Sequence, residues 1–483
     1  MTTLATTAPS PPAPERRALP SRLRRRVGGG VVSSPLDAVT LLTGVALTLF
    51  LLPSRLVVPG LGGAGRPAVL LGIGLFILWL AQCANPAGTP HGATATRWVI
   101  FALLGTNLLS WALGNARGNT GEETRSSDRY MLVLIALCGV ALAVAELIPD
   151  RASLDTVLIR VCWCAGGMAM FGALEFMFHL DLVSRIKVPG LQLNQALVTV
   201  SSRGGATKFA RVNGTALHYI EYGVVCAMVL PLATHYALHA KERTTKLARW
   251  ALVVLLGSGI VFSISRSAIL AFGVVAIVMI PVWTGRLRTN AIVVVLLSGA
   301  LCKVVYPGLL GTIRSLFTNL GHDPSISGRT SDYSAVSPLI DGRPWFGRGA
   351  GTYLPNVYRF LDNQYLKSLI ETGIVGVTAL VAVFLVGIFV ARSTRHRGCD
   401  TQAQHLGQAL TAAILVGALT AGTFDQLSFG IAATTVFLCV GAAASNRKLT
   451  VPPGSEVRDS APWVAPAWTW LRERADAGAA KRR

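Results

Sequence analysis

The most constraining feature of this sequence is the recurrence of apolar runs long enough to cross a lipid bilayer. A transmembrane helix needs about 20 mostly apolar residues to traverse the hydrocarbon core. Runs of roughly this length recur from residue 36 to residue 444, separated by polar stretches. Charged residues make up only 14% of the 483 residues, well below the roughly 25% of an average soluble domain. The sequence therefore predicts an all-helical, polytopic membrane protein.

The sequence predicts about twelve transmembrane helices. The expected ranges are 36–53, 67–84, 98–113, 130–148, 154–178, 217–239, 248–263, 267–284, 289–306, 369–391, 406–423 and 426–444.

These ranges divide the chain into five expected parts. They are a disordered basic cytoplasmic tail (1–35), N-terminal and central transmembrane helices (36–306), a large extracytoplasmic loop carrying active-site residues (307–368), C-terminal transmembrane helices (369–444) and a cytoplasmic tail (445–483). The last part contains three tryptophans and a basic end, which fit either an interfacial helix or a solvated tail.

The positive charge indicates an orientation in the membrane. The net charge is +21, but lysine and arginine lie in short clusters between apolar runs, which favours contact with anionic membrane lipids over nucleic acid. The short basic loops at 241–249, 286–288 and 392–397 fall on one side if the N-terminus is inside. We therefore expect a plasma-membrane protein with both termini in the cytoplasm.

Two long loops, 180–216 and 307–366, then face outward and carry many basic residues. Long loops are translocated largely regardless of charge, so this positive charge does not contradict the orientation. Arginine is well suited to a bidentate grip on phosphate, and an outward anion-binding site is the functional interpretation. Its candidate residues in these loops are Arg211, Arg329, Arg343 and Arg348.

A further arginine lies in the tight connection "SISRSA" between two predicted spans. Arg266 is flanked there by Ser263, Ser265 and Ser267. A charged residue at membrane depth is costly unless it is paired or functional, whereas a long side chain can also extend to the lipid headgroups. The surrounding serines favour a polar site. The later "GRGAG" is no dinucleotide loop, because it follows no strand and lacks the full glycine pattern.

The order of four motifs resembles a known family. "SISRSA", "SGRTSDYSAV", "RPWFGRGAGTY" and "LDNQYLKSLIETGIVG" resemble the C-terminal module of the O-antigen ligase and polymerase superfamily, GT-C-type membrane glycosyltransferases. The resemblance covers roughly residues 255–390 and implies about twelve helices with a large outer loop closing a cavity. It also implies that Arg266 and Arg329 bind the diphosphate of a polyprenyl-linked glycan. Where the family usually has His-Asn, this chain has Asp362 and Asn363.

The chemistry is also coherent from the residues themselves. Fixed guanidinium groups can stabilise the negative charge that grows on a leaving diphosphate, so the reaction requires neither a metal nor a cofactor. Asp362 could take the proton of the acceptor hydroxyl, while Asn363 orients the reacting groups. Asp362 could instead be the N-cap of the next helix. His322, His218 and Glu221 are alternative proton acceptors.

The predicted activity is transfer of a glycan from a polyprenyl diphosphate carrier to a glycan or lipid acceptor during cell-surface polysaccharide assembly. An O-antigen-type polymerase differs from a ligase only in the acceptor, and the sequence does not separate them. A transporter of lipid-linked glycans is the alternative from another class, although the two halves show no convincing internal repeat. A transferase using a polyprenyl monophosphate ranks low. Enzymes of that family resemble one another in an acidic pair in the first outer loop, and the corresponding loop here, "SRLVVPGLGGAGRP", lacks an acidic residue.

Overall fold

A computed structural model describes residues 37–85, 94–179, 183–194, 211–305, 336–397 and 400–450. The chain divides into Met1–Asp37 and Ala38–Arg483, and the description below concerns the second unit. Arg329 and His322 lie outside the described residues, as do the first predicted tail, residues 451–483 of the second and the first part of the predicted large loop. Residues 445–450 of the second predicted tail continue α15.

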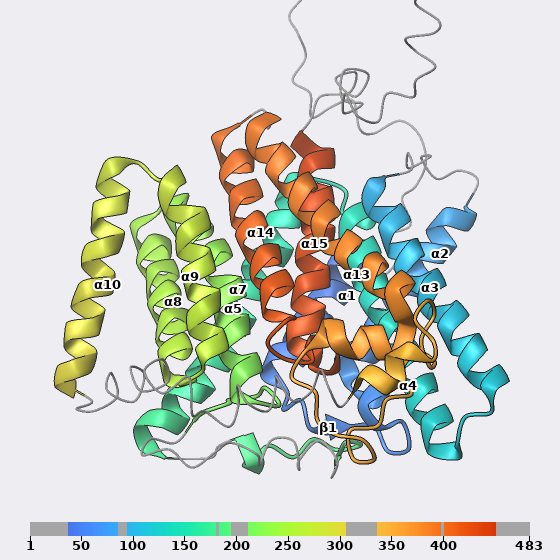
Figure 1. Cartoon of the computed structure of the whole chain (residues 1–483). Coiled ribbons are helices and arrows are strands. Elements are labelled where there is room, and N and C mark those ends of the chain that lie inside the picture. The colour runs from blue at the N-terminus through green and yellow to red at the C-terminus, as the bar shows by residue number, and fades with distance from the viewer. Residues whose placement is uncertain are drawn as a thin grey trace, which may run out of the picture. The chain divides into compact units, whose positions relative to one another are not determined.

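The described part of this unit is built almost entirely from helices (Figure 1). They are α1 (Ala38–Leu51), α2 (Pro67–Ala84), α3 (Ala95–Arg117), α4 (Gly121–Leu142), α5 (Arg151–Phe178), α7 (Tyr219–Leu238), α8 (Arg243–Phe262), α9 (Arg266–Met279), α10 (Gly285–Val305), α13 (Gln364–Arg397), α14 (Thr401–Thr420) and α15 (Gly430–Thr450).

Several short elements complete the fold. A π-helix, η2 (Ala143–Leu147), continues α4, and 3-10 turns occur at η1 (Gly62–Gly65), η3 (Val183–Arg185), η4 (Ile280–Val282) and η6 (Gln426–Ser428). Strand β1 (Leu56–Val57) pairs antiparallel with β2 (Gln192–Leu193), with Leu56 opposite Leu193.

The all-helical membrane fold predicted from the sequence is confirmed. Each expected range overlaps one of these helices, and seven helices in the described residues are long and apolar enough to cross a membrane. The chain is thus a multi-pass membrane protein, while the full number of twelve spans stays a prediction.

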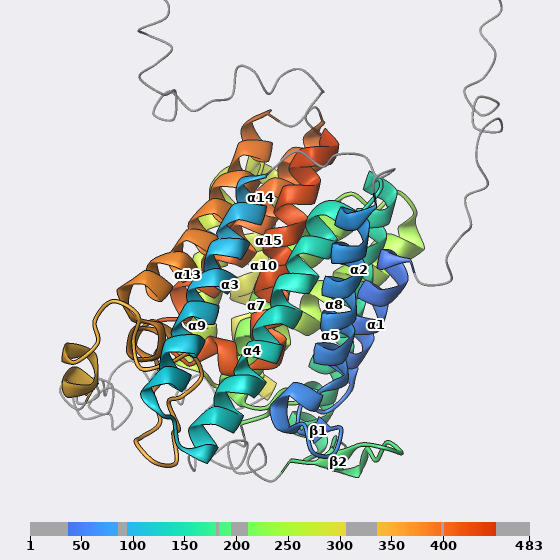
Figure 2. The ribbon, with the colours of Figure 1, turned by 90° about the vertical axis from the view of Figure 1, so that its right-hand side faces the viewer.

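The helices pack side by side around α7 (Figure 2). Helix α7 contacts α5, α8, α9, α14 and α15. In its most apolar stretch 94% of the residues are buried, against 22% in the corresponding stretch of α8. Because α7 is apolar all round, it belongs in the interior of the bundle. We call the end of the bundle where α7, α9, α13 and α15 begin the site end, and the opposite end, which carries the basic turns, the basic end.

Helix α13 is broken near the site end. Gly373 has φ 65° and ψ −168°, so the helical hydrogen bonding is interrupted there. The N–H groups of Ile374 and Val375, just beyond the break, donate instead to the carbonyls of Pro344 (2.8 Å) and Trp345 (3.2 Å). An unpaired backbone group inside a bilayer costs several kcal/mol. The segment before α13 therefore completes the broken helix.

The same segment also pairs with the helix before the break. The N–H groups of Arg348 and Gly349 donate to the carbonyls of Ile370 (2.9 Å) and Glu371 (3.0 Å). The approach is so close that a Cβ at Gly373 would lie 2.3 Å from backbone atoms of Trp345. Glycine is required there by both its left-handed φ and the lack of space.

A small apolar cluster fastens the rest of the segment to α13. Val336, Tyr353 and Leu361 pack with Leu366 and Ile370 of the helix, and all five are buried. The cluster is separate from the main core of the bundle. Residues 336–363 are thereby held against the first turns of α13, at the site end.

The broken helix generates a stability prediction. Gly373→Ala places a side chain in a left-handed backbone against Trp345, and we expect it to reduce stability by roughly 3 kcal/mol or more. Gly257→Ala in α8 is the matched control, because a Cβ there has no heavy atom within 4 Å. The measurement is thermal unfolding in detergent, and equal midpoints for the two variants would contradict this account of the break.

Candidate active site

The turn between α8 and α9 presents Arg266 at the site end. Arg266 is the first residue of α9 and is half-buried, while Ser263, Ser265 and Ser267 around it are buried. The turn packs closely on α7, since a Cβ at Gly223 would lie 2.4 Å from the Ser263 hydroxyl. The three serines next to Arg266 in the sequence are thus buried, while their role as a polar site for the arginine stays a prediction.

Arg211 lies beside the start of α7. Its Nη1 donates to the hydroxyl of Tyr219 (2.7 Å), and its guanidinium carbon is 4.7 Å from the centre of that ring. His218 is the N-cap of α7, where its Nδ1 accepts the N–H of Ile220 (3.3 Å). Burial and then the charge of Arg211 lower the pKa of His218 to about 4. The imidazole is therefore neutral at physiological pH and a weak proton acceptor.

Glu221 acts as a cap for two helix ends. It is fully buried, and its carboxylate accepts the backbone N–H groups of Leu217 (2.9 Å), Ile431 (2.8 Å) and Ala432 (3.2 Å). A carboxylate is favourable at the start of a helix, here α15. These bonds occupy both oxygens of Glu221, which makes it a structural residue rather than a ready proton acceptor.

Arg66 provides the positive charge that acts on Glu221. Its Nε donates to the carbonyl of Ser54 (3.1 Å), and burial lowers the pKa of Arg66, with the nearby Glu221 opposing that shift. The two residues lie far apart in the sequence, and no local pattern marked Arg66 as part of this end of the protein.

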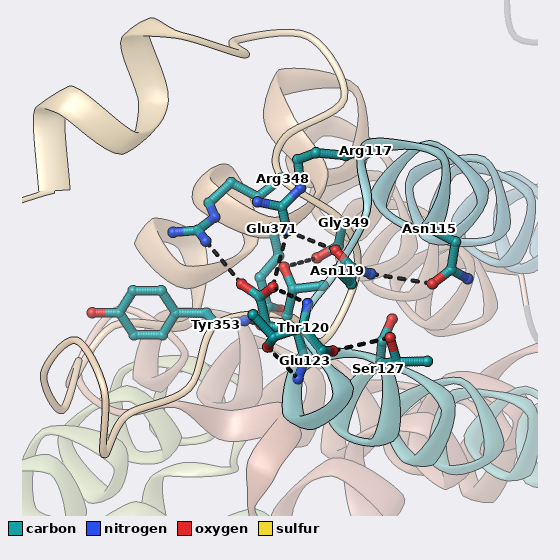
Figure 3. A network of polar contacts seen from close by, with 12 residues as sticks. Asn115, Arg117, Asn119, Thr120, Glu123, Ser127, Arg348, Gly349, Tyr353 and Glu371 are labelled. Atoms are coloured by element: carbon teal, nitrogen blue, oxygen red, sulfur yellow. Dashed lines mark hydrogen bonds and ion pairs between the residues drawn. The ribbon is translucent and has the colours of Figure 1, made fainter.

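Arg348, predicted to bind the diphosphate, is held by a buried carboxylate (Figure 3). Its Nη2 donates to Oε1 of Glu123 (2.9 Å), whose other oxygen lies 3.5 Å from Nη2 of Arg117. The guanidinium of Arg348 also lies over the ring of Tyr358, 4.6 Å from its centre. The ion pair between Arg348 and Glu123 thus attaches residues 346–351, which we call the glycine-rich segment, to α4.

Two serines, Ser110 of α3 and Ser127 of α4, bind the same segment, and Ser127 is drawn in Figure 3. The Ser127 hydroxyl donates to the carbonyl of Ala350, and the Ser110 hydroxyl lies 2.9 Å and 2.8 Å from the carbonyls of Phe346 and Glu371. The segment is therefore a fixed wall between α3, α4 and α13. Arg343 precedes this wall, and its side chain is exposed.

The start of α13 separates the two candidate catalytic residues. Oδ1 of Asn363 accepts the N–H of Leu366 (3.1 Å), which is N-cap geometry. Asp362 lies one residue earlier and is exposed. The cap that the sequence allowed for Asp362 therefore falls to Asn363, because helix α13 begins one residue later than that alternative required.

A buried ion pair beside Asn363 escaped the sequence analysis. Lys367 is 8% exposed, and its Nζ donates to Oδ2 of Asp425 (2.8 Å) and to the Ser428 hydroxyl (2.9 Å). Glu371 lies one turn further along α13, and its Oε1 accepts the N–H of Tyr353 (3.1 Å). The sequence motif "YLKSLIETG" shows Lys367 and Glu371 as charged residues. No sequence pattern indicated that Asp425, in the connection between α14 and α15, is the partner of Lys367.

The fold and this end of the bundle define a multi-pass, all-helical membrane protein with basic and carboxylate groups gathered at one end. Residues 251–381 match the family model described as O-Antigen ligase, which confirms the resemblance to the O-antigen ligase and polymerase superfamily. The match includes Arg266, the glycine-rich wall and the start of α13. It supports a membrane glycosyltransferase-like function in polysaccharide assembly. No curated protein matches the chain.

The assignment of the cap is testable by stability. Asn363→Ala removes the acceptor for the Leu366 N–H, and we expect it to cost about 1 kcal/mol. Asp362→Ala leaves the cap acceptor of Asn363 in place, and we expect it to cost less stability than Asn363→Ala. Both values come from unfolding of the purified variants in the same detergent. A larger loss for Asp362→Ala than for Asn363→Ala would reverse the assignment.

Proposed function

We propose that this protein transfers a glycan from a polyprenyl diphosphate carrier to an acceptor at the outer face of the plasma membrane. The observation that carries the proposal is Arg266, placed in a turn of buried serines within the segment that matches the O-antigen ligase family. A half-buried guanidinium at the start of an apolar helix is suited to binding an anion. The diphosphate of a lipid-linked glycan is such an anion.

The arginines then have different roles toward the diphosphate. Arg266 and Arg329 stabilise the charge that develops on it as the glycosidic bond breaks, since guanidinium groups bind phosphate oxygens in pairs. Arg211, stacked on Tyr219, and the exposed Arg343 contribute positive charge around it. Arg348 is bound to Glu123, so its contribution is mainly to hold the wall of the site.

Asp362 is the proposed proton acceptor for the attacking hydroxyl. It is an exposed carboxylate at the start of α13, directly before the cap formed by Asn363. Because the cap occupies the amide oxygen of Asn363, the amide nitrogen is the group that would orient the substrate. The proton leaves the acceptor hydroxyl for Asp362 while its oxygen bonds to the anomeric carbon and the diphosphate departs.

We expect loss of the diphosphate contacts to abolish transfer. Arg266→Ala and Arg329→Ala each remove a proposed contact, while Arg125→Ala is the matched control, because Arg125 is an exposed arginine of α4 outside the matched segment. Release of polyprenyl diphosphate is measured with purified variants that elute from gel filtration as the unchanged protein does. Wild-type rates for both Arg266→Ala and Arg329→Ala would exclude the diphosphate clamp.

For the proposed base, Asp362→Asn should lower the rate of transfer by about two to four orders of magnitude. The fold of the Asp362→Asn variant should be unaffected, because the amide has nearly the same shape as the carboxylate that it replaces. Turnover at the wild-type rate would remove Asp362 from the mechanism.

The reaction itself is tested in liposomes containing a polyprenyl diphosphate-linked oligosaccharide and candidate acceptors. Diphosphate release with a longer lipid-linked glycan identifies a polymerase, and release with the glycan on a different acceptor identifies a ligase. If the lipid only changes leaflet with its glycan attached, the protein is a transporter and the proposal fails.

A further inference from the structure

Three histidines meet at the basic end of the bundle, opposite the proposed active site. His235 and His239 lie one turn apart at the end of α7, and His405 is in the first turns of α14. One ligand nitrogen from each residue can be chosen so that all three lie within 4.8 Å of one another. His235 is buried, whereas His239 and His405 are partly exposed, so the cluster is reachable from solvent.

We propose that His235, His239 and His405 form a binding site for a divalent transition-metal ion of the zinc type. Three neutral imidazoles match the ligands that zinc prefers, at about 2.0–2.1 Å, with a fourth position left open. The existing separation of 3.0 Å between Nδ1 of His235 and Nδ1 of His405 is close to that of two nitrogens on one tetrahedral ion.

The surroundings of His239 have the form of a metal site. Its Nδ1 lies 2.8 Å from the carbonyl oxygen of His235, so this nitrogen carries the proton and Nε2 is left as the ligand atom. Metal-binding histidines commonly donate their second N–H to a carbonyl in this way, which fixes both the tautomer and the ring orientation. This bond joins two members of the cluster within one helix.

The ligand atoms of the cluster, rather than the charges around it, select the class of ion. The guanidiniums of Arg151, Arg249 and Arg395 act electrostatically on its histidines, while the nearby Asp155 is engaged by Arg151 and by the Tyr236 hydroxyl. Hard cations such as Mg²⁺ and Ca²⁺ require oxygen ligands, which the three histidines do not supply. Ions that bind neutral nitrogen strongly, such as Zn²⁺, Co²⁺, Ni²⁺ and Cu²⁺, fit the site.

Trp283 supplies a reporter for the site. Its Nε1 donates to Nε2 of His405 (3.3 Å), which places the His405 proton on Nδ1, facing His235. Coordination of a metal through Nδ1 of His405 moves that proton to Nε2. A protonated Nε2 cannot accept a hydrogen bond, so Trp283 loses its bond to His405. Metal binding should therefore change the fluorescence of Trp283 and link α7 to α14 at the basic end.

The test uses full-length protein purified without a polyhistidine tag and stripped with a chelator. Titration with Co²⁺ should give saturable binding of one ion per chain, with visible absorption bands of a nitrogen-bound ion, and Zn²⁺ should displace it. His239→Gln and His405→Gln should each weaken binding by more than about a hundredfold, since even outer contacts contribute ten- to a hundredfold. Trp283→Phe should bind normally but lack the fluorescence change.

The matched control is His396→Gln, because His396 is an exposed histidine of α13 near the same end. It should bind Co²⁺ like the unchanged protein. A second readout is thermal unfolding, whose midpoint Zn²⁺ should raise in the unchanged protein and in His396→Gln, but in neither cluster variant. Absence of saturable binding, or binding that survives in both cluster variants with normal elution from gel filtration, would overturn the proposal.

Discussion

The backbone pairing between the broken helix α13 and the segment before it is the interaction on which the site end depends. A break in a membrane helix exposes N–H and C=O groups that lipid cannot satisfy. Here Pro344, Trp345, Arg348 and Gly349 satisfy those groups on both sides of Gly373. A stretch that reads as a loop is therefore an integral part of the helical bundle, and the start of α13 with Asp362 is placed by it.

Charged side chains at the site end are likewise paired, either with an opposite charge or with backbone N–H groups. Glu123 binds Arg348 and Arg117, Asp425 binds Lys367, and Glu221 receives three backbone N–H groups. Buried charges without partners would cost far more than these bonds return, so each partner is needed once the other is present. The pairs also join separate elements, namely the glycine-rich wall to α4, α13 to the α14–α15 connection, and α7 to α15.

The arginines predicted for diphosphate binding differ in their surroundings. Arg348 has a buried carboxylate as its partner, and its position is explained by the fold. Arg266 lies at the start of α9 between buried serines, and Arg211 donates to the hydroxyl of Tyr219 and stacks on its ring. These two arginines are the described residues that we propose for binding the diphosphate.

Sequence alone determined the elements, because apolar runs of membrane-spanning length admit only helices. The expected range 67–84 coincides with α2, and the motif order from "SISRSA" to "LDNQYLKSLIETGIVG" predicted the resemblance that the family match over residues 251–381 supports. Tertiary structure decided the partners. The pairs Arg348–Glu123 and Lys367–Asp425 and the meeting of His405 with α7 join residues more than 50 positions apart. Helical periodicity reports which face of a helix is apolar, but carries no information on which distant helix packs against it.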